Sequence, residues 1–550
     1  MSNPPRLLPD LVPALRSDLL AAGFTVAGVG EILGEVALDA LGREEAVPAR
    51  LAVARLLADP GTDTVVRARA ALTSLFLLGG SVAREDVASA LPTLGAQGAV
   101  ALGLVGQAPA LGAQAPADVP DGTVPDRTVP DGTVPDGTVP DVLRAIVDLR
   151  PYAADDARGP IDWWLASDLG ELATGRALEP DHVLGAGGAS LTLAQVTSRA
   201  DVGRVLDLGT GCGIQALHAS RHAREVVATD LSTPALAFAA FTAALNGVEI
   251  ELREGSMLEP VAGELFDLVV SNPPFVITPH APGGDDALPL FEYRDGGRAG
   301  DDLVRDLVTG VGSVLAPGGT VQMLGNWEVR RGQDWTERVG EWLDASGLDG
   351  WVIQRELLDP ARYAETWLRD GGLTADRDPD GYAAAYAAWL DDFASRDVEA
   401  IGFGIVYLRK PADGRVTLRR LEEHTGTVHQ PLGEHLAASL AAHDWLEARS
   451  DAALADEHLL VAPDVTEERY LTPGAEDPNV VIVRQGGGLG RGVHASTALA
   501  ALVGVCDGEL SVGQILGAIA ALFEVDADEL TAEVLPGVRG LVRDGLLIPA

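Results

Sequence analysis

The sequence has few basic residues, and only one of them, Lys410, is a lysine. Lysine and arginine together number 40 in 550 residues, against 81 aspartates and glutamates, so the formal net charge is −41. A surface that binds DNA or RNA needs clustered positive charge to neutralise phosphates. This composition argues against a broad nucleic-acid-binding face, although a local cluster of arginines is compatible with it.

Cysteines and long apolar runs are also scarce. The two cysteines, Cys212 and Cys506, cannot form a disulfide framework or a cysteine-based metal site. No apolar run approaches the roughly 18 residues expected of a membrane-spanning helix. The longest runs lie at residues 71–80 and 495–506, and the first residues, MSNPPRLLPD, lack the pattern of a signal peptide. We therefore predict a cytoplasmic protein with no membrane span and no bound metal.

The pattern of the chain changes along its length, which is long enough for about three domains. We predict a helical N-terminal domain at residues 1–106, a low-complexity linker at 107–141, a lead-in segment that packs on the next domain at 142–200, an α/β domain at 201–410 and a C-terminal accessory domain with a winged-helix-like end at 411–550. The linker repeats Thr-Val-Pro-Asp-Gly between residues 118 and 141, and these residues favour turns over helices or central strands. From residue 201 the alternation of strand, loop and helix predicts a parallel sheet covered by helices.

A glycine-rich turn follows an apolar run in VLDLGTGCG, residues 205–213. Its three glycines allow the backbone to approach a ligand closely. Their spacing lacks the third glycine of the dinucleotide fingerprint. Asp207, just ahead of the turn, would repel a pyrophosphate but suits a cofactor with an ammonium group and no phosphate. S-adenosylmethionine is such a molecule.

Two further loops fit the same cofactor. The run VVATD ends in Asp230, whose carboxylate can accept both hydroxyls of a ribose, as in other nucleotide-binding α/β folds. Leu231 follows directly. After the next short strand, Ser256 and Met257 would lie beside the adenine, where Ser256 can bond to its amino group and Met257 can pack on the ring.

The stretch FDLVVSNPPF, residues 266–275, predicts the chemistry. A buried strand ends in Asn272, Pro273, Pro274 and Phe275. The prolines stiffen the loop and remove amide donors, so that carbonyl acceptors remain. The side-chain oxygen of Asn272 and the carbonyl of Pro273 can each accept a hydrogen from an NH2 group, which aligns its nitrogen for methyl transfer. Phe275 can lie against a flat amide or base.

These motifs together resemble the class I methyltransferases with an Asn-Pro-Pro-Phe/Tyr motif, and most of all the HemK/PrmC-type protein glutamine methyltransferases. NPPFVITP (272–279) is similar to the loop of the eukaryotic and archaeal HemK-like enzymes. YRDGGRAGDDLVRDL (293–307) resembles their Gly-Gly-x-x-Gly segment, and EPDHVLGAGGASLTLA (179–194) loosely resembles their lead-in. The resemblance implies a Rossmann-like, seven-stranded, mostly parallel sheet at 201–410, with cofactor and substrate at the carboxyl ends of the strands.

The resemblance also implies a role for each candidate residue. The implied contacts are Asp207, Gly209, Thr210, Gly211 and Gly213 with the methionine part of S-adenosylmethionine, Asp230 and Leu231 with the ribose, Ser256 and Met257 with the adenine, and Asn272, Pro273, Pro274 and Phe275 with the methyl acceptor. Asn272 also borders the cofactor. HemK-like enzymes usually carry an acid in the adenine loop, where this chain has Ser256.

Three functions stay open. The leading one is N-methylation of a glutamine in a protein such as a peptide-chain release factor. The second is methylation of an exocyclic amine of guanine or adenine in RNA or DNA, because base methyltransferases share the tetrapeptide and extrude their target base. The third is a non-catalytic scaffold with a methyltransferase fold.

Some residues that could look reactive have simpler interpretations. We predict that Cys212, although it lies in the cofactor turn, is a small packing residue. His182, His218, His222 and His280 do not show metal-ligand spacing, and we predict packing or surface roles for them.

Overall fold

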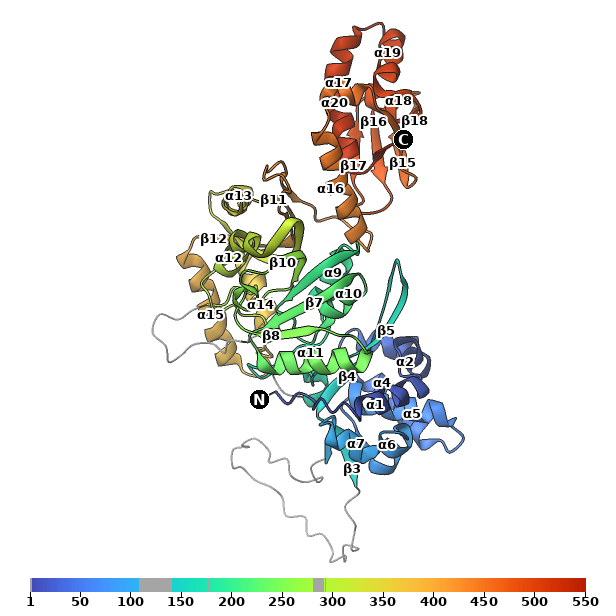
Figure 1. The fold of residues 1–550 in the computed structure, drawn as a ribbon, viewed down its shortest axis with the longest axis vertical. Helices are drawn as coiled ribbons and strands as arrows, with labels where there is room; N and C mark the ends of the chain where they lie inside the picture. Colours follow the sequence, from blue (N-terminus) through green and yellow to red (C-terminus); the bar gives the residue numbers. More distant parts are fainter. Residues whose placement is uncertain (1, 108–140, 176–177, 280–290, 292) are drawn as a thin grey trace, which may run out of the picture.

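The computed structural model describes residues 2–107, 141–175, 178–279, 291 and 293–550. The predicted repeat therefore lies almost wholly outside the described residues, and so does His280. Figure 1 shows three units arranged along the long axis of the molecule: the N-terminal unit at one end, a unit built on a large sheet in the middle, and the C-terminal unit at the other end.

The N-terminal unit is mainly helical, as the sequence predicts. Its elements are α1 (Val12–Ala21), α2 (Val26–Leu33), α3 (Glu35–Leu41), α4 (Val47–Ala58), α5 (Thr64–Leu72), the π-helix η1 (Thr73–Leu77), α6 (Arg84–Ala90), α7 (Gly95–Ala101) and a small antiparallel sheet of β1 (Ser81–Ala83), β3 (Val142–Ala145) and β2 (Val105–Gln107). Side-chain caps start two of the helices: Thr25 accepts from Gly28 N, and Asp63 accepts from Val65 N.

No single helix among the described residues is long and apolar enough to cross a membrane. One bent pair, Val12–Ala21 with Val26–Leu33, meets the requirement of length and composition only when both helices are taken together.

A long hairpin joins the N-terminal unit to the middle unit. It consists of β4 (Val147–Asp156) and β5 (Gly159–Asp168), and α8 (Glu171–Thr174) and α9 (Gly188–Val196) follow it. The indole of Trp164 in β5 donates to Phe24 O of the N-terminal unit at 2.7 Å. The side chain of Asn246 bonds to both backbone groups of Trp164, at 3.0 and 2.8 Å. The hairpin thus holds the two units together through buried hydrogen bonds.

The central sheet has eight strands in the order β13-β11-β12-β10-β9-β6-β7-β8. They are β6 (Val202–Leu208), β7 (Ala223–Asp230), β8 (Glu251–Glu254), β9 (Phe266–Ser271), β10 (Leu315–Arg330), β11 (Asp349–Leu358), β12 (Val398–Arg409) and β13 (Arg419–Glu423). All neighbours are parallel except those of β12, which is antiparallel to β10 and β11. The sheet is mostly parallel, as predicted, but has one strand more than the seven expected. The extra strand, β13, lies beyond residue 410, in the segment predicted to be the C-terminal domain.

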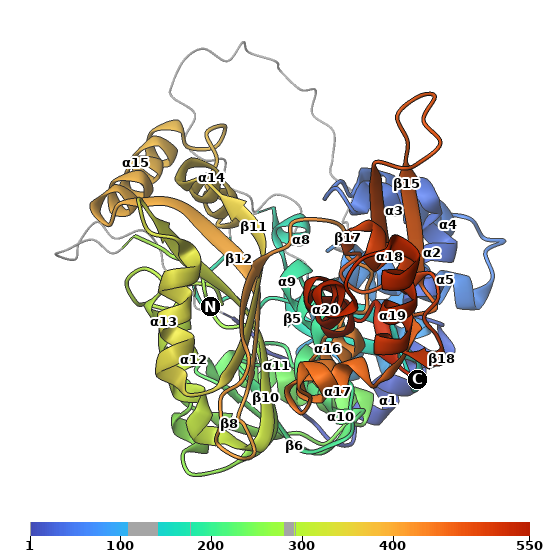
Figure 2. The same cartoon turned by 90° about the horizontal axis from the view of Figure 1, so that it is seen from above.

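Helices cover both faces of the sheet, and Figure 2 shows α12 and α13 on one side with α9 and α16 on the other. Alternate residues of each strand serve the two faces: Leu206 packs with the α12–α13 side, and Val205 packs with the α9–α16 side. The remaining elements of this unit are α10 (Ile214–Ser220), α11 (Thr233–Asn246), η2 (Glu259–Val261), α12 (Asp302–Gly310), η3 (Val311–Val314), α13 (Trp335–Ser346), α14 (Pro360–Asp370) and α15 (Pro379–Ser395).

The C-terminal unit packs around its own apolar core. Its elements are α16 (Gly433–Glu447), α17 (Asp451–Ala455), β14 (His458–Val461), β15 (Val465–Tyr470), β16 (Val480–Gln485), β17 (Gly492–Ala495), α18 (Thr497–Val503), β18 (Asp507–Ser511), α19 (Val512–Phe523), α20 (Ala527–Arg543) and β19 (Leu547–Pro549). The two helices and final strand predicted between 511 and 549 correspond to α19, α20 and β19. The winged-helix-like character of this end stays a prediction.

Candidate functional site

The carboxyl ends of four neighbouring strands meet at one edge of the sheet. Leu208 at the end of β6 pairs with Thr229 of β7 on one side and with Ser271 of β9 on the other, and Asp230 pairs with Glu254 of β8. The chain order reverses between β6 and β9, which is where open α/β sheets bind their ligands. The structure therefore brings the glycine turn, Asp230, the 255–257 loop and the Asn-Pro-Pro-Phe loop together, as predicted.

The glycine turn leaves open space for a ligand. Gly209, Gly211 and Gly213 have φ values of 75°, 55° and 90°, which favour glycine. A Cβ atom on Gly209 or Gly211 would find no protein atom within 4 Å. A Cβ on Gly213 would lie 3.3 Å from Ala239, so this glycine allows close helix packing instead. The first two glycines thus form an open cradle, which fits a bound cofactor.

Asp207 lies at the base of this turn and is only 1% exposed. Its Oδ2 accepts from the Thr210 hydroxyl at 2.7 Å and from Ala216 N at 2.9 Å. The hydroxyl of Thr210 is thus engaged with Asp207. The second oxygen, Oδ1, is enclosed and accepts no hydrogen bond from the described residues. Burial raises the pKa of the Asp207 carboxyl to about 7, which these hydrogen bonds only partly offset. An orphaned acceptor fits an ammonium group, as S-adenosylmethionine would supply.

Cofactor affinity is expected to depend on pH through Asp207. Below pH 7 the carboxyl of the cofactor-free protein carries a proton, which must leave before an ammonium group can pair with the carboxylate. Affinity for S-adenosylmethionine should therefore rise about tenfold between pH 6 and pH 8. Isothermal titration calorimetry of wild type and Asp207→Asn at pH 6 and pH 8 tests this. The variant lacks the titrating carboxyl, so any pH dependence that it keeps comes from the ionisable groups of the ligand. A similar rise in both proteins would contradict the assignment.

Asp230 connects the second loop to the first. One of its carboxylate oxygens accepts from Gly211 N and the other from Ser232 N, each at 2.9 Å. A carboxylate has about four acceptor positions, so Asp230 can receive ribose hydroxyls beside these backbone donors. Leu231 beside it is 70% exposed and is therefore accessible to a ligand at this edge of the sheet. This arrangement fits the ribose and adenine of the predicted cofactor.

The third loop is held in a fixed shape. Gly255 N donates to Asp230 O at 3.0 Å, and Met257 adopts a left-handed backbone with φ of 49°. Met257 is half-buried against the α12–α13 side of the sheet. The contacts predicted for Ser256 and Met257 with adenine stay predictions.

The acceptor loop begins where β9 ends. The Ser271 hydroxyl donates to Leu208 O at 2.8 Å, which ties this loop to the glycine turn. The side-chain oxygen of Asn272 is enclosed and accepts no hydrogen bond from the described residues. Pro273 is buried, and Phe275 packs against the cores on both faces of the sheet and against that of α14–α15. A buried amide oxygen without a partner is costly, and an NH2 group of a substrate would satisfy it.

A segment distant in the sequence braces this loop from behind. Phe275 forms an isolated bridge with Asp295, and Val276 N donates to Arg294 O at 2.9 Å. Arg294 is buried, and its Nη1 donates to Trp367 O at 2.6 Å and to Asp370 at 2.9 Å in α14. The helical pair α14–α15, inserted between β11 and β12, therefore supports the acceptor loop. The sequence pattern did not predict this role of residues 293–295.

Tyr363 of α14 contacts the same loop directly. It is fully buried, and its hydroxyl accepts from Ile277 N at 3.0 Å and from Asn326 Nδ2 at 2.8 Å. Four aromatic rings surround it, from Trp367, Trp389, Phe393 and Phe403. The hydroxyl thus joins the loop after Phe275 to β10 and α14. It is a positioning residue that sequence reasoning missed.

Tyr363→Phe is expected to slow methyl transfer about tenfold or more while leaving the Kd for S-adenosylmethionine within about twofold of wild type. The ring stays packed, but Ile277 N–H and the Asn326 amide lose their common acceptor. The matched control is Tyr386→Phe in α15, whose hydroxyl donates to Ala361 O at 2.9 Å and touches no part of the acceptor loop. The test measures the rate of methyl transfer and the Kd for S-adenosylmethionine in both variants. Equal losses of rate in Tyr363→Phe and Tyr386→Phe would contradict a positioning role for Tyr363.

The cysteine and histidines near the site have packing surroundings. Cys212 is buried, and burial raises the pKa of its thiol to about 12. His218 is buried between Tyr152 and Trp163 and lies 2.7 Å from the Tyr152 hydroxyl; burial lowers its pKa to about 3, so it is neutral. Among the described residues, no group of three or more His, Cys, Asp or Glu could hold a metal ion.

The strand order, the open glycine turn at the switch point and the acidic residues at the ends of β6 and β7 define a class I methyltransferase fold. Residues 186–282 match the methyltransferase small domain. The chain therefore contains an S-adenosylmethionine-dependent methyltransferase domain, which confirms the predicted class and cofactor. Residues 21–116 and 437–549 match two domains of unknown function, DUF7059 and DUF7782.

Curated relatives match only the catalytic part. The release factor glutamine methyltransferase of Xylella fastidiosa (strain 9a5c) is 40% identical over 130 residues, which cover 23% of this chain and 47% of that protein. That of Deinococcus radiodurans is 40% identical over 131 residues, 22% of this chain and 45% of that protein. The ribosomal RNA small subunit methyltransferase C of Escherichia coli (strain K12 / DH10B) is 30% identical over 141 residues, 25% of this chain and 35% of that protein. The chain thus spans half or less of the length of these relatives.

Proposed function

We propose that this chain transfers the methyl group of S-adenosylmethionine to the side-chain nitrogen of a glutamine in a protein of the release-factor kind. The observation that carries the proposal is the enclosed, unpartnered amide oxygen of Asn272 beside the open glycine turn at the switch point. The similarity to release factor glutamine methyltransferases supports the same acceptor.

The residues of the chain would act mainly by positioning. Asn272 Oδ1 and the carbonyl of Pro273 accept the two hydrogens of the substrate NH2 group, which restricts the nitrogen to one orientation. S-adenosylmethionine held by the glycine turn, Asp207 and Asp230 would supply an electrophilic methyl group to this nitrogen, and the proton that the nitrogen gives up would leave to solvent. Alignment of this kind can lower the barrier by several kcal/mol, on the order of what well-oriented reactants gain.

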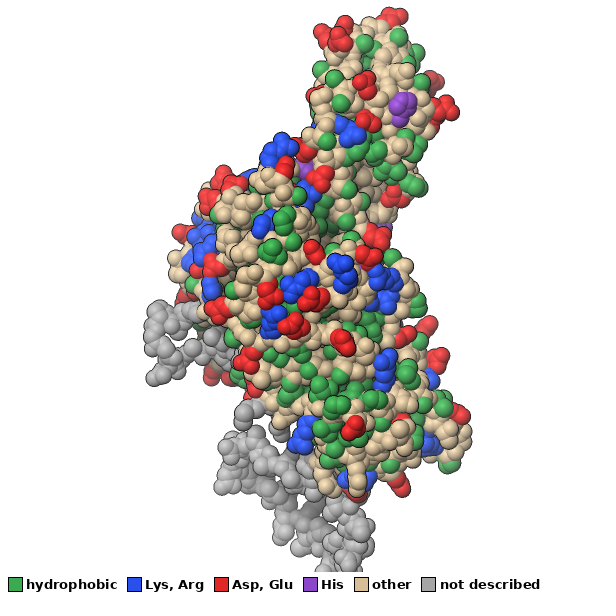
Figure 3. Space-filling view, in the orientation of Figure 1, with side chains coloured by type: hydrophobic (Ala, Val, Ile, Leu, Met, Phe, Trp, Pro, Cys, Tyr) green, Lys and Arg blue, Asp and Glu red, His purple; other side chains and the backbone are tan. Residues whose placement is uncertain are grey.

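Charge supports a protein substrate over a nucleic acid. Figure 3 shows blue and red side chains interspersed over the middle unit on the face in view. Arg204 pairs with Glu225 and Glu264, both at 2.9 Å, and Arg253 pairs with Glu251 at 2.8 Å. Arginines engaged with carboxylates are poorly available to phosphates, and the net charge of −41 would repel a polynucleotide.

Methylation of a base in ribosomal RNA is the second candidate. The similarity to the ribosomal RNA methyltransferase favours it, and so does Phe275, whose ring could stack on a base.

Purified release factors and ribosomal subunits offered side by side distinguish the two proposals. With wild-type protein and S-adenosylmethionine, tandem mass spectrometry should find one added methyl group on a glutamine of a release factor and none on ribosomal RNA. Methylated RNA nucleosides with unmodified release factor would replace the first proposal by the second. If neither the release factors nor the ribosomal RNA gained a methyl group, both proposals would be contradicted.

A further inference from the structure

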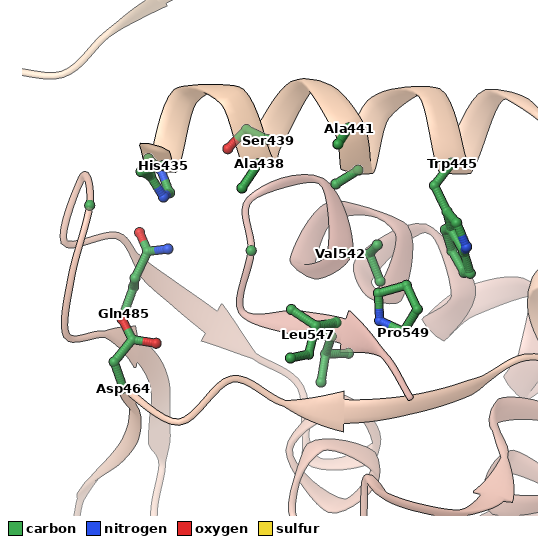
Figure 4. A pocket seen from close by; sticks show the side chains of 14 residues that line it. His435, Ala438, Ser439, Ala441, Trp445, Asp464, Gln485, Val542, Leu547 and Pro549 are labelled. Carbon is green, nitrogen blue, oxygen red and sulfur yellow. The ribbon is translucent and has the colours of Figure 1, made fainter. Parts of the chain in front are cut away.

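A pocket of about 420 Å³ lies in the C-terminal unit, away from the edge of the sheet where the cofactor loops meet. Figure 4 shows α16 along one side, with Leu547 and Pro549 of β19 opposite and Gln485 and Asp464 at one end. The exposed Ala438 and Ala441 of α16 border it. A volume of this size is within the range of small-molecule sites, roughly 300–1,000 Å³.

At one end of the pocket, two buried hydrogen-bond acceptors, on Gln485 and His435, have no donor among the described residues. Gln485 is only 4% exposed, and its Nε2 donates to Asp544 O at 3.0 Å, which fixes the orientation of the amide. Its Oε1 is left enclosed and accepts no hydrogen bond from the described residues. His435 Nε2 is likewise enclosed without a partner, and burial lowers the pKa of this ring, which favours its neutral form. A neutral imidazole nitrogen can accept a hydrogen bond.

Asp464 adds a negative charge at the same end. One of its carboxylate oxygens accepts from Gly487 N at 2.7 Å, which holds the side chain against the 486–488 loop. Three acceptor-capable groups therefore converge where the pocket is most polar. A ligand head that donates several hydrogen bonds and carries positive charge satisfies all of them. The guanidinium groups of Arg420 and Arg491 also act on His435, but both are paired with carboxylates, those of Glu422 and Asp544.

The rest of the pocket is apolar. Trp445, Val542, Leu547 and Pro549 line it together with the alanines of α16. His435 and Trp445 are ten positions apart on one helix, which corresponds to about 15 Å along its axis. The polar head and the aromatic wall are thus separated by about 15 Å, the length of a long alkyl chain.

We propose that this pocket binds a small organic amine, with its ammonium group at Gln485, His435 and Asp464 and an apolar or aromatic body against Trp445 and Leu547. Leu436 in the first turn of α16 and Leu432, the residue before this helix, pack in the core on the α9 side of the sheet. The ligand would therefore contact a helix that belongs to both the catalytic core and the C-terminal unit.

The test is calorimetric titration of the full chain with 8-phenyloctylamine, which is long enough to reach from the polar end to Trp445, and with its uncharged and anionic analogues, 8-phenyloctanol and 8-phenyloctanoate. The amine should bind about tenfold or more tightly than the alcohol, because hydrogen bonds to charged donors are the stronger ones. No binding of 8-phenyloctanoate is expected. Equal affinity for all three, or no binding of the amine, would overturn the proposal.

Three variants locate the binding. Gln485→Leu removes the acceptor at similar volume. It should weaken binding of the amine about tenfold and binding of the alcohol by less, because the hydroxyl is an uncharged donor. Gln485→Glu restores an acceptor and adds charge, so it should bind the amine at least as tightly as wild type. Ala441→Leu narrows the apolar part of the pocket without changing its polar end. It should weaken binding of the amine and binding of the alcohol by similar factors. Unchanged amine binding in Gln485→Leu and Ala441→Leu would place the amine elsewhere and contradict the proposal.

Discussion

Asn272→Ala is expected to lower the rate of methyl transfer about a hundredfold or more, with a much smaller effect on the Kd for S-adenosylmethionine. The enclosed oxygen of this side chain is the acceptor that would hold the substrate NH2 group, and nothing else among the described residues uses it. Removal of one such positioned group typically costs about 10²- to 10³-fold in rate. The loop itself should persist, because Ser271, Phe275 and Val276 hold it through their own contacts.

Single-turnover rates and cofactor titrations of Asn272→Ala check this expectation. Asn479→Ala is the control, since Asn479 is an exposed asparagine of the C-terminal unit. Asn479→Ala should match wild type in both measurements. A rate for Asn272→Ala within about threefold of wild type would show that the tetrapeptide does not position the acceptor.

Asp230→Ala is expected to raise the Kd for S-adenosylmethionine about a hundredfold or more. The variant loses two charge-assisted hydrogen bonds to the ribose, each worth on the order of 1.5–3 kcal/mol. It also loses the bonds from Gly211 N and Ser232 N, which hold the glycine turn in its open form. Asp230→Asn should have a smaller effect, about tenfold, because the amide still offers one acceptor.

Asp526→Ala provides a matched control for Asp230→Ala. Asp526 also accepts from two backbone amides, those of Asp528 and Glu529, but it caps α20 in the C-terminal unit. The control should lose stability without losing cofactor affinity. Equal Kd values for wild type and Asp230→Ala, measured by calorimetry, would contradict the ribose assignment.

The parts of the site that follow a strand directly could be predicted from the sequence. VLDLGTGCG, VVATD and FDLVVSNPPF each show an apolar run and then a change to polar or glycine residues, so the chain order alone places Asp207, Asp230 and Asn272 at the ends of parallel strands. Parallel pairing brings those ends to one edge. The C-terminal helices α19 and α20 were predictable for a similar reason, because their apolar spacing and flanking polar residues are local signals.

The bracing of the acceptor loop could not be predicted, because it depends on contacts between distant residues. Tyr363 lies 86 residues beyond Ile277, and Arg294 lies 76 residues before Asp370. Neither pair leaves a periodic pattern. Similarly, β13 is a five-residue strand whose place in the sheet comes from pairing with β11, and its sequence, RRLEE, has a single apolar residue and no alternation that would indicate a strand.

Transfer of tritium from labelled S-adenosylmethionine to a cell lysate tests the central claim most directly. Wild-type protein and Asn272→Ala are compared, and the products are digested with protease or with nuclease before counting. Label that wild type deposits, that protease removes and that Asn272→Ala fails to deposit is the predicted result. Label that resists protease and disappears with nuclease would contradict the proposed protein substrate, and equal labelling by the variant would contradict the role of Asn272.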